Sequence, residues 1–275
     1  MNTIPNVKLN SGYEMPMVGL GVYKASPSET VQAVEWALKG GYRHIDTASL
    51  YKNEKEVGEA IKDSGLARAE IFVTTKIWND DIVSERSVEA LKESLYRLGM
   101  DYVDLLLIHW PVKGWQKAYV DLAECVDKGL IRSLGVSNFK THHLEAIKGI
   151  SKLVPAIDQV ETHVYFQERR ILEYCKSNGI TMEAWRPLGG AGSRELVDPT
   201  LVAIAKAHTV SPAQVALKWN VQRGVIVIPK SVHQDRIKSN IDLFSFDLSG
   251  EEMEAISSLD RKDGREGRDP DEYGQ

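Results

Sequence analysis

Short apolar runs that alternate with helical segments along the whole chain constrain its fold more than any other feature of the sequence. Strands without polar alternation, each followed by a helix, are typical of parallel strands that are buried on both faces. Eight such units within 275 residues predict a (β/α)8 TIM barrel. The expected strands are 17–22, 42–47, 71–76, 103–109, 131–136, 156–161, 180–185 and 224–230.

Helix start and stop signals separate these runs. Ser26, Pro27 and Glu29 form the pattern of a capping box with proline in the first turn, and Gly40 follows the last turn of the expected helix. The same start signal recurs at 211–214. The segments between the apolar runs are therefore predicted to be helices, as a barrel of alternating strands and helices requires.

The main competing architecture, an open doubly wound sheet, would require a glycine-rich turn after the first strand. The segment GLGVYK has Gly19 and Gly21 but Lys24 where a third glycine belongs, which disfavours that fold. Residues 7–18 read as a separate β-hairpin that turns at 10–12 and would cover the barrel floor. No linker rich in Pro, Gly or Ser interrupts the chain, so we expect one domain over residues 1–275.

Composition narrows the classes of partner and the compartment. A formal net charge of −5 and a pI near 5.9 disfavour nucleic acid or an anionic membrane as the main partner. The start of the chain does not read as a secretory signal, and no apolar run is long enough to span a bilayer. Cys125 and Cys175 have no metal-like spacing and predict reduced thiols. We expect a cytoplasmic monomer whose partner is a small molecule.

Three consecutive strands of the expected barrel end in ionisable residues, which are Asp46, Lys76 and His109. The C-terminal strand ends of such a barrel face one shared cavity, and neighbouring strands lie about 4.8 Å apart. Each residue alone has a structural explanation: an aspartate can cap a helix, a lysine can be solvated and a histidine can be satisfied in the core. Their occurrence together predicts a catalytic site.

Tyr51 adds a proton donor to this group. A phenol has a pKa of about 10, which is high for a proton donor at neutral pH, and a neighbouring ammonium lowers it. We expect Asp46 to hold Lys76 as a cation, Lys76 to lower the pKa of Tyr51, and His109 to orient a substrate oxygen. We also expect Asn53 and Glu56 to cap the following helix. The chemistry predicted is acid catalysis at a carbonyl without a metal.

Five segments together resemble the signature segments of the aldo-keto reductase family, and they are spaced as in that family: YRHIDTASLY, TTKIWND, LLIHWPV, GVSNF and VIPKSVHQDRIKSN. The similarity runs over essentially the whole chain and is greatest to the branch that includes 2,5-diketogluconate reductases and prostaglandin F synthases. It implies reduction of aldehydes and ketones (keto sugars, dicarbonyls or prostaglandin-type carbonyls) with NADPH, Tyr51 being the general acid. The family's four catalytic residues fall on Asp46, Tyr51, Lys76 and His109.

The resemblance also implies the residues that bind cofactor and substrate. Ser137, Asn138 and Gln159 would hydrogen-bond the nicotinamide amide, and Trp185 would stack on its ring. The adenosine phosphate end would be bound by Lys230, Ser231, Val232, Arg236 and Asn240. Further cofactor contacts would come from Gly21, Val22, Arg186 and Leu188. The substrate pocket would be lined by Tyr23, Trp78, Trp110 and His109.

The sequence departs from the family pattern at Asp158, Val164, Arg186 and Ser239, where Asn, Pro, Ser and Glu are usual. None of these is one of the four catalytic residues.

The cofactor preference follows from the segment after the eighth expected strand, which in the resembled family binds the 2′-phosphate. Lys230, Ser231 and Arg236 together suit a doubly charged 2′-phosphate, which predicts a preference for NADPH over NADH.

The sequence is compatible with three other interpretations. Tyr51 and Lys55 imitate the Tyr-x-x-x-Lys pair of short-chain dehydrogenases, but the glycine-rich turn, the mid-chain position and the upstream serine of that family are missing. A Schiff-base lyase could use Lys76 as its nucleophile, which would leave Tyr51 and Arg236 without a role. A non-catalytic cofactor-binding protein on the same fold is the third, and the presence of all four catalytic residues disfavours it.

Overall fold

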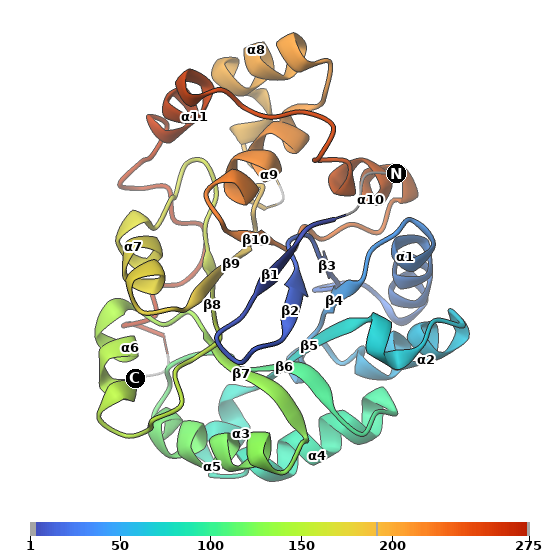
Figure 1. Cartoon of the computed structure of the whole chain (residues 1–275), viewed down its shortest axis with the longest axis vertical. Coiled ribbons are helices and arrows are strands. Elements are labelled where there is room, and N and C mark those ends of the chain that lie inside the picture. Colours follow the sequence, from blue (N-terminus) through green and yellow to red (C-terminus); the bar gives the residue numbers. More distant parts are fainter. Residues whose placement is uncertain (1–3, 191, 274–275) are drawn as a thin grey trace.

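Eight parallel strands form the centre of the molecule in this computed structural model, which describes residues 4–190 and 192–273. Neighbouring strands follow one another in chain order, and bridges from Val18 to Val227 and from Gly21 to Lys230 join the two ends of the sheet. The result is the expected (β/α)8 barrel (Figure 1). Its strands are β3 (Leu20–Gly21), β4 (His44–Asp46), β5 (Phe72–Ile77), β6 (Val103–Ile108), β7 (Ile131–Ser137), β8 (Ile157–Glu161), β9 (Thr181–Trp185) and β10 (Ile226–Val227).

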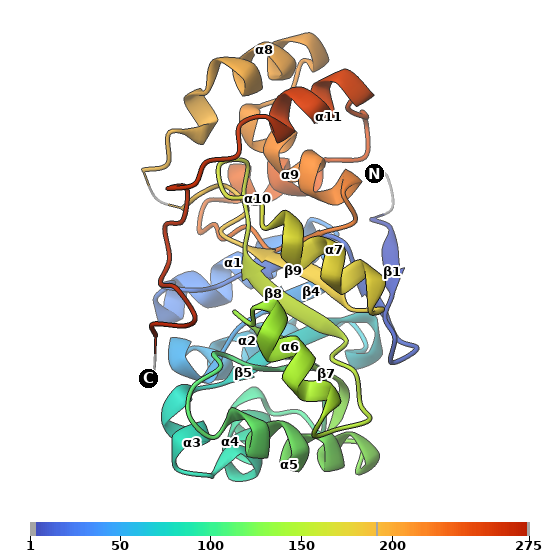
Figure 2. The same cartoon turned by 90° about the vertical axis from the view of Figure 1, so that its left-hand side faces the viewer.

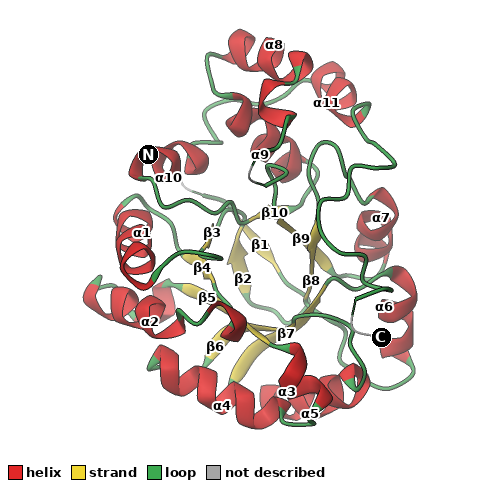
Figure 3. Cartoon of the chain, turned by 180° about the vertical axis from the view of Figure 1, so that it is seen from behind, coloured by secondary structure: helices red, strands yellow, loops and turns green. Residues whose placement is uncertain are grey.

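Helices surround the strands, and their apolar faces pack on the outside of the sheet (Figure 3). The predicted capping box of the first helix is present, because the Ser26 amide donates to Glu29 at 2.8 Å and the Glu29 amide donates to the Ser26 hydroxyl at 3.4 Å. The helices are α1 (Pro27–Lys39), α2 (Glu54–Asp63), α3 (Asn79–Val83), α4 (Ser87–Leu98), α5 (Trp115–Asp127), α6 (Thr141–Lys148), α7 (Arg169–Ser177), α8 (Pro199–His208), α9 (Pro212–Gln222), α10 (Gln234–Ile241) and α11 (Gly250–Ser257), with short 3-10 helices η1 (Ser49–Tyr51), η2 (Arg68–Glu70) and η3 (Glu195–Val197).

An antiparallel hairpin covers the N-terminal end of the barrel, as the sequence predicts. Strands β1 (Asn6–Lys8) and β2 (Glu14–Pro16) pair across the barrel axis (Figure 1). The hairpin tip is tied down by Asn10, whose amide donates to the carbonyl oxygens of Pro155 and Gly179 at 2.9 and 3.0 Å. Residues from the hairpin and from inside the barrel share one apolar cluster. The hairpin does not cover the opposite, C-terminal end of the strands, where the candidate site lies.

The strand boundaries agree with the apolar runs, but the first and last strands of the barrel are only two residues long. They are also the pair that closes the sheet. A Cβ on Gly21 would lie 3.0 Å from the carbonyl oxygen of Ile228, so glycine permits this close approach. Pro229 has no amide hydrogen to continue the ladder of β10.

The expected cap on α2 is wrong. Asn53 stands at the N-cap position, but its side chain makes no capping bond there, and no capping box with Glu56 forms. The Asn53 amide donates instead to the carbonyl oxygen of Val22 at 3.0 Å and to the Thr30 hydroxyl at 3.2 Å. The Asn53 side chain is therefore used in tertiary contacts with Val22 and Thr30 and does not cap α2.

The C-terminal segment 261–273 runs along the end of the barrel opposite to the hairpin (Figure 2). It contains no helix or strand in the described residues. Cys125 and Cys175 are free and buried. In the described residues no helix is long and apolar enough to cross a membrane.

Candidate active site

An ammonium and a carboxylate that face each other inside the barrel form the centre of the site. Asp46 ends β4, and Lys76 lies in the neighbouring strand β5. The Lys76 Nζ donates to both carboxylate oxygens of Asp46, at 2.6 and 2.7 Å, and to the carbonyl oxygen of Thr47 at 2.9 Å. Each ammonium hydrogen thus has an acceptor, which compensates for the burial of this charge.

The pair keeps Lys76 charged. Burial alone would lower the pKa of the ammonium, but Asp46 and then Tyr51 outweigh burial, and the pKa of Lys76 is raised. Burial also raises the pKa of Asp46, while Lys76 and a hydrogen bond from Gln159 act in the opposite direction. The expectation that Asp46 holds Lys76 as a cation agrees with this geometry.

Tyr51 and His109 lie beside the pair. Tyr51 ends η1, whose Ser49 hydroxyl donates to the Lys76 carbonyl oxygen at 2.9 Å. The Lys76 Nζ is 5.2 Å from the centre of the Tyr51 ring, and the rings of Tyr51 and His109 meet edge to face at 6.0 Å. The four residues that the sequence singled out therefore lie together near the C-terminal ends of β4, β5 and β6. We call Asp46, Tyr51, Lys76 and His109 the catalytic group, after the role that the sequence predicts for them.

The predicted lowering of the Tyr51 pKa is wrong. Burial raises the pKa of the phenol to about 12, and Lys76 opposes this increase without cancelling it. The reason is that the half-buried phenol loses part of its contact with water, while the negative charge of Asp46 opposes the effect of the ammonium. Tyr51 is consequently protonated throughout the neutral range, which is the state that a proton donor needs.

His109 is neutral in this environment. Burial first, and then the charge of Lys76, lower the pKa of the imidazole well below its usual value. Its Nδ1 is buried and has no hydrogen-bond partner among the described residues. The imidazole, as a neutral group, therefore keeps hydrogen-bonding capacity that the described residues do not use.

A carboxylic acid that sequence reasoning missed lies on the inner side of the site. The Gln159 amide donates to Asp46 at 2.9 Å and to Glu183 of β9 at 2.7 Å. Burial and the charge of Asp46 raise the pKa of Glu183 to about 8. The His44 Nε2 lies 3.7 Å from the same carboxyl, and burial lowers the pKa of His44 to about 3. Glu183 had no signal in the sequence, because it stands in the middle of an apolar strand.

The residues expected around the nicotinamide are mutually hydrogen-bonded. The Asn138 amide donates to the carbonyl oxygen of His109 and to the Ser137 hydroxyl, both at 3.0 Å. Its oxygen accepts from the Trp185 indole at 2.8 Å, which fixes the plane of that ring. The Ser137 hydroxyl donates to the carbonyl oxygen of Gln159 at 2.8 Å. The structure thus brings Ser137, Asn138, Gln159 and Trp185 together beside the catalytic group.

The residues expected at the adenosine phosphate end form a separate group after β10. Lys230 and Arg236 are exposed, and neither has an ion-pair partner in residues 4–190 and 192–273. Ser231 accepts from the His233 amide at 3.1 Å, where α10 begins without a side-chain cap. Val232 is half-buried and Asn240 is buried against the barrel. This group offers two cations and a free helix N-terminus to an anion.

The remaining residues that the resemblance assigned to the cofactor lie at the mouth of the barrel. Gly21 and Val22 are buried where β3 meets β10. Arg186 is exposed, with its guanidinium 5.4 Å from the centre of the Trp185 ring, and its φ of 52° is unusual for a residue other than glycine. Leu188 is half-buried in the same loop. Arg186 is thus a further cation at the rim of the cofactor group.

Aromatic residues surround the catalytic group. Tyr23 packs on Tyr51 at 4.9 Å between ring centres, and Trp78 meets His109 edge to face at 5.0 Å. Trp110 is 9% exposed, because Tyr273 of the C-terminal segment covers it at 4.5 Å. Tyr23, Trp78 and Trp110 therefore lie where a pocket wall is expected. The sequence does not predict that Tyr273 covers Trp110, because nothing in the local sequence places the two residues side by side.

Three of the departures from the family pattern lie outside the catalytic group. Asp158 points away from the catalytic group: it accepts from the Phe139 amide at 3.4 Å, and burial raises its pKa well above the usual value. Val164 is fully buried in an apolar cluster with residues of α8 and α9. Ser239 donates to the carbonyl oxygen of Arg236 at 3.4 Å and stays outside the catalytic group.

Two alternative interpretations lose support from the geometry. Lys55 is exposed and pairs with Glu59 at 3.5 Å, so it does not join Tyr51 in a short-chain dehydrogenase pair. A Schiff-base lysine must be deprotonated to attack a carbonyl, whereas the pKa of Lys76 is raised and its hydrogens are bound to oxygens.

A second buried ionic cluster lies next to the site and consists of Glu161, His163 and Glu195, which we call the loop latch. The His163 Nε2 is 3.3 Å from Glu161, and its Nδ1 pairs with Glu195. Burial lowers the pKa of His163, but the two carboxylates outweigh burial and raise it to about 9. Glu161 also accepts from the amides of Glu266 and Gly267, both at 2.7 Å. The latch thereby joins the loop after β9 to the C-terminal segment.

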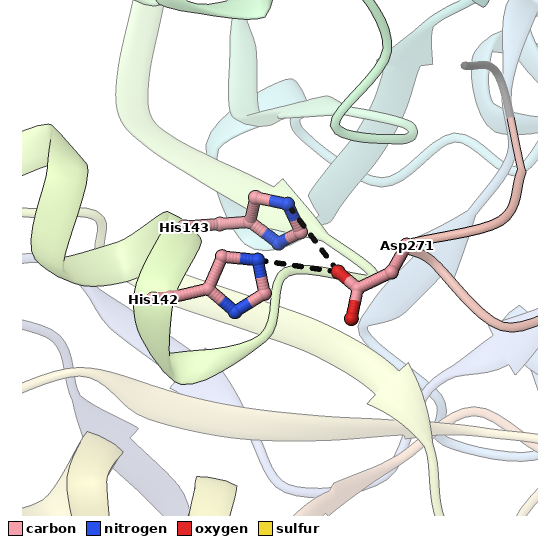
Figure 4. Close-up of side chains that lie close together, drawn as sticks. All are labelled: His142, His143 and Asp271. Atoms are coloured by element: carbon pink, nitrogen blue, oxygen red, sulfur yellow. Dashed lines mark ion pairs between the residues drawn. The ribbon is translucent and has the colours of Figure 1, made fainter.

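Three side chains near the C-terminal segment bring potential metal ligands within 4.8 Å of one another: His142, His143 and Asp271 (Figure 4). Their chemistry favours ion pairing. The His143 Nδ1 accepts from the Lys140 amide at 3.1 Å, so the neutral ring carries its proton on the nitrogen that faces Asp271. The Lys140 ammonium already binds Asp271 at 2.6 Å and also binds Asp269. We therefore assign these residues to anchoring the C-terminal segment.

Comparison with known proteins places this geometry in a family. Residues 17–261 match the model of the aldo/keto reductase family. The chain is 46% identical over 268 residues to the glyoxal reductase of Bacillus subtilis, covering 97% of this chain and 96% of that protein. It is 44% identical over 273 residues to the 9,11-endoperoxide prostaglandin H2 reductase of Trypanosoma cruzi, covering 97% and 95%. A solved aldo-keto reductase of Bombyx mori in complex with NADP superposes with a TM-score of 0.90 at 37% identity, covering 95% and 94%.

Proposed function

The chain belongs to the aldo/keto reductase family, and on that premise we propose that it reduces aldehydes and ketones to alcohols with NADPH. The observation that carries the proposal is the buried group at the C-terminal strand ends. There a charged Lys76, held by Asp46 at 2.6 Å, lies beside the phenol of Tyr51 and the neutral imidazole of His109. A structural ion pair would need neither of the last two groups.

The chemistry follows from these residues. NADPH, when bound, supplies the hydride that is added to the carbonyl carbon. His109 and Tyr51 hold the carbonyl oxygen, and Tyr51 donates its proton as negative charge develops there. An alkoxide is a much stronger base than a phenolate, so a phenol with a pKa of about 12 can protonate it. Lys76 stabilises the phenolate that remains, and Asp46 keeps Lys76 charged and in place.

The cofactor preference is proposed from the cations after β10. Lys230, Arg236 and the open N-terminus of α10 suit the 2′-phosphate that distinguishes NADPH from NADH. A charge-assisted hydrogen bond contributes about 1.5–3 kcal/mol, so Arg236→Ala should weaken NADPH binding roughly 10- to 150-fold. NADH binding should change far less, because NADH has no phosphate at that position.

Fluorescence titration of both cofactors tests this preference. Lys238→Ala is the matched control, because Lys238 is an exposed cation on the same helix α10. We expect that variant to bind both cofactors like wild type, and we expect added salt to reduce the NADPH advantage. Equal wild-type dissociation constants for NADPH and NADH would show that these cations do not read the phosphate.

The substrate class is proposed from the aromatic walls and from the relatives. Tyr23, Trp78 and Trp110 offer apolar contact around one polar centre, which suits dicarbonyls, keto sugars and bulkier ketones of the prostaglandin type. The names of the two curated relatives, a glyoxal reductase and a prostaglandin H2 reductase, support this breadth. A panel of carbonyl compounds, followed through the loss of NADPH absorbance, tests it. No turnover with any aldehyde or dicarbonyl would contradict the proposed activity.

We further propose that the protein acts in the cytoplasm as a monomer with one domain, and that it has no nucleic-acid or membrane partner. The net charge of −5 and the two free thiols support this proposal. Light scattering after gel filtration tests the oligomeric state: a mass near 30.7 kDa is expected for the chain.

A further inference from the structure

The C-terminal segment 261–273 forms part of the wall of the candidate active site. Glu161 at the end of β8 accepts from the amides of Glu266 and Gly267 at 2.7 Å each. The backbone at Gly267 lies so close to Trp185 that a Cβ there would be 2.5 Å from the indole Cη2. Lys140 binds Asp269 and Asp271 further along the segment. The segment is therefore anchored on both sides of Arg268.

Arg268 is stacked against this wall. Its guanidinium lies 4.6 Å from the centre of the Tyr273 ring, and the same ring meets Trp110 edge to face at 4.5 Å between ring centres. Trp110 follows His109 directly in the chain. A series of side-chain contacts thus leads from Trp110, the residue next to His109, through the edge-to-face ring of Tyr273 to the exposed guanidinium of Arg268.

The charge of Arg268 is not neutralised by the protein. Arg265, three residues earlier, pairs with Glu168 at 3.1 Å, and Lys140 is bound by two aspartates. Arg268 is exposed and has no carboxylate within ion-pair distance in the described part of the chain. A chain with a formal net charge of −5 thus leaves this guanidinium unpaired beside its pocket.

We propose that Arg268 selects carbonyl substrates that carry a carboxylate, a specificity that rests on the reductase function proposed above. The planar guanidinium presents parallel N–H donors, which match the two oxygens of a carboxylate. The contact with the Tyr273 ring limits the orientations of the Arg268 guanidinium, and this reduces the conformational entropy that is lost when an anion binds. The reacting carbonyl lies between Tyr51 and His109, and the carboxylate of the same molecule extends along Trp110 to Arg268.

The test compares 4-carboxybenzaldehyde with its methyl ester, because the two share one aldehyde and differ in one charge. Arg268→Gln should lower kcat/KM for the acid by about five- to twentyfold, mainly through KM, and should change the ester by less than about twofold. The loss is expected to be smaller than for a buried pair, because solvent screens an exposed guanidinium. Arg268→Lys should retain part of the preference.

Arg261→Gln is the matched control. Arg261 belongs to the same segment and also lies over a tyrosine, with its guanidinium 3.5 Å from the centre of the Tyr165 ring. That ring is not part of the series of contacts from Trp110 to Arg268. Arg261→Gln should leave the acid-to-ester ratio unchanged, and salt should raise the KM of the acid alone in wild type. An unchanged ratio in Arg268→Gln, or equal losses for both substrates, overturns the assignment while the reductase function stands. If wild type reduces neither compound but reduces other aldehydes of the panel, the assignment of Arg268 is overturned and the reductase function stands; no turnover with any aldehyde or dicarbonyl overturns both.

Discussion

Two buried ionic clusters lie at the same end of the barrel, yet they differ in what their cations contact. In the catalytic group, Lys76 is bound to one carboxylate and to a backbone carbonyl, and a phenol and a neutral imidazole lie beside it. In the loop latch, His163 lies between two carboxylates that also bind backbone amides. The first cluster leaves a group that can bind something else, and the second is closed upon itself.

The comparison shows that burial and a shifted pKa do not identify a catalytic residue. His163 is as buried as Lys76, and its pKa is raised to about 9. What separates the clusters is that each ring nitrogen of His163 faces a carboxylate, whereas His109 pairs with no carboxylate in the described residues and lies among aromatic rings. We therefore expect changes in the catalytic group to abolish turnover, and changes in the latch to reduce the free energy of unfolding.

Lys76→Met should have the largest effect, because it should lower both turnover and the free energy of unfolding. It removes the cation from the buried Asp46, which should cost about 3–5 kcal/mol of the free energy of unfolding. Turnover should also fall by about two to four orders of magnitude, since the Tyr51 phenolate loses its stabilising charge. Urea unfolding and NADPH consumption measure the two quantities. A variant that turns over like wild type would remove Lys76 from the mechanism.

Tyr51→Phe should affect turnover alone. The ring keeps its packing on Tyr23, so the free energy of unfolding should change by less than about 1 kcal/mol. Loss of the proton donor should lower kcat by about two to four orders of magnitude while NADPH binding is retained. Parallel titration and turnover assays separate these effects, and turnover above a tenth of the wild-type value would contradict the assignment of the general acid.

His163→Gln should show the opposite pattern. The raised pKa of His163, about 9 instead of 6.5, corresponds to roughly 3 kcal/mol of the free energy of unfolding at neutral pH. The folded fraction should still reduce carbonyls at a similar kcat. Adding Glu195→Gln should recover part of the loss, because the two carboxylates then no longer face each other without a cation.

The pH dependence of unfolding checks the same assignment. A folded-state pKa above the unfolded value stabilises the protein fully below about pH 6.5, and the effect disappears as the pH rises through 9. The difference in free energy of unfolding between wild type and His163→Gln should therefore shrink across this window. A difference that is constant from pH 6 to pH 10 would exclude a charged His163 as its source.

The smallest expected effect concerns the pH profile of turnover. Tyr51 has a pKa of about 12 and the pKa of His109 lies well below 6.5, so neither changes its protonation between about pH 7 and 9. We expect kcat for reduction to be flat across that range. A decline centred near pH 8 would instead point to Glu183, whose pKa is raised to about 8 through burial and Asp46.

The sequence predicts the barrel, and the proximity of the four residues proposed as catalytic, because both depend on repeated local signals. Each buried strand is a short apolar run, and Asp46 and His109 stand where such a run ends. Long-range contacts explain what could not be predicted. Glu183 and the latch depend on pairing between strands and loops, and Tyr273 reaches Trp110 from a segment 163 positions later. The Tyr51 pKa was misjudged because the extent of its burial depends on the assembled barrel.

The fixed orientation of Trp185 has a stereochemical consequence. Its indole donates to Asn138, whose amide is held in turn by Ser137 and His109, so the ring cannot turn. A nicotinamide that stacked on this surface, as we propose, would have one face covered by the indole and only the other open to a carbonyl. The two hydrogens at its reactive ring carbon would then not be equivalent: deuterium on the open face would pass into the alcohol, and deuterium on the covered face would stay on the oxidised cofactor.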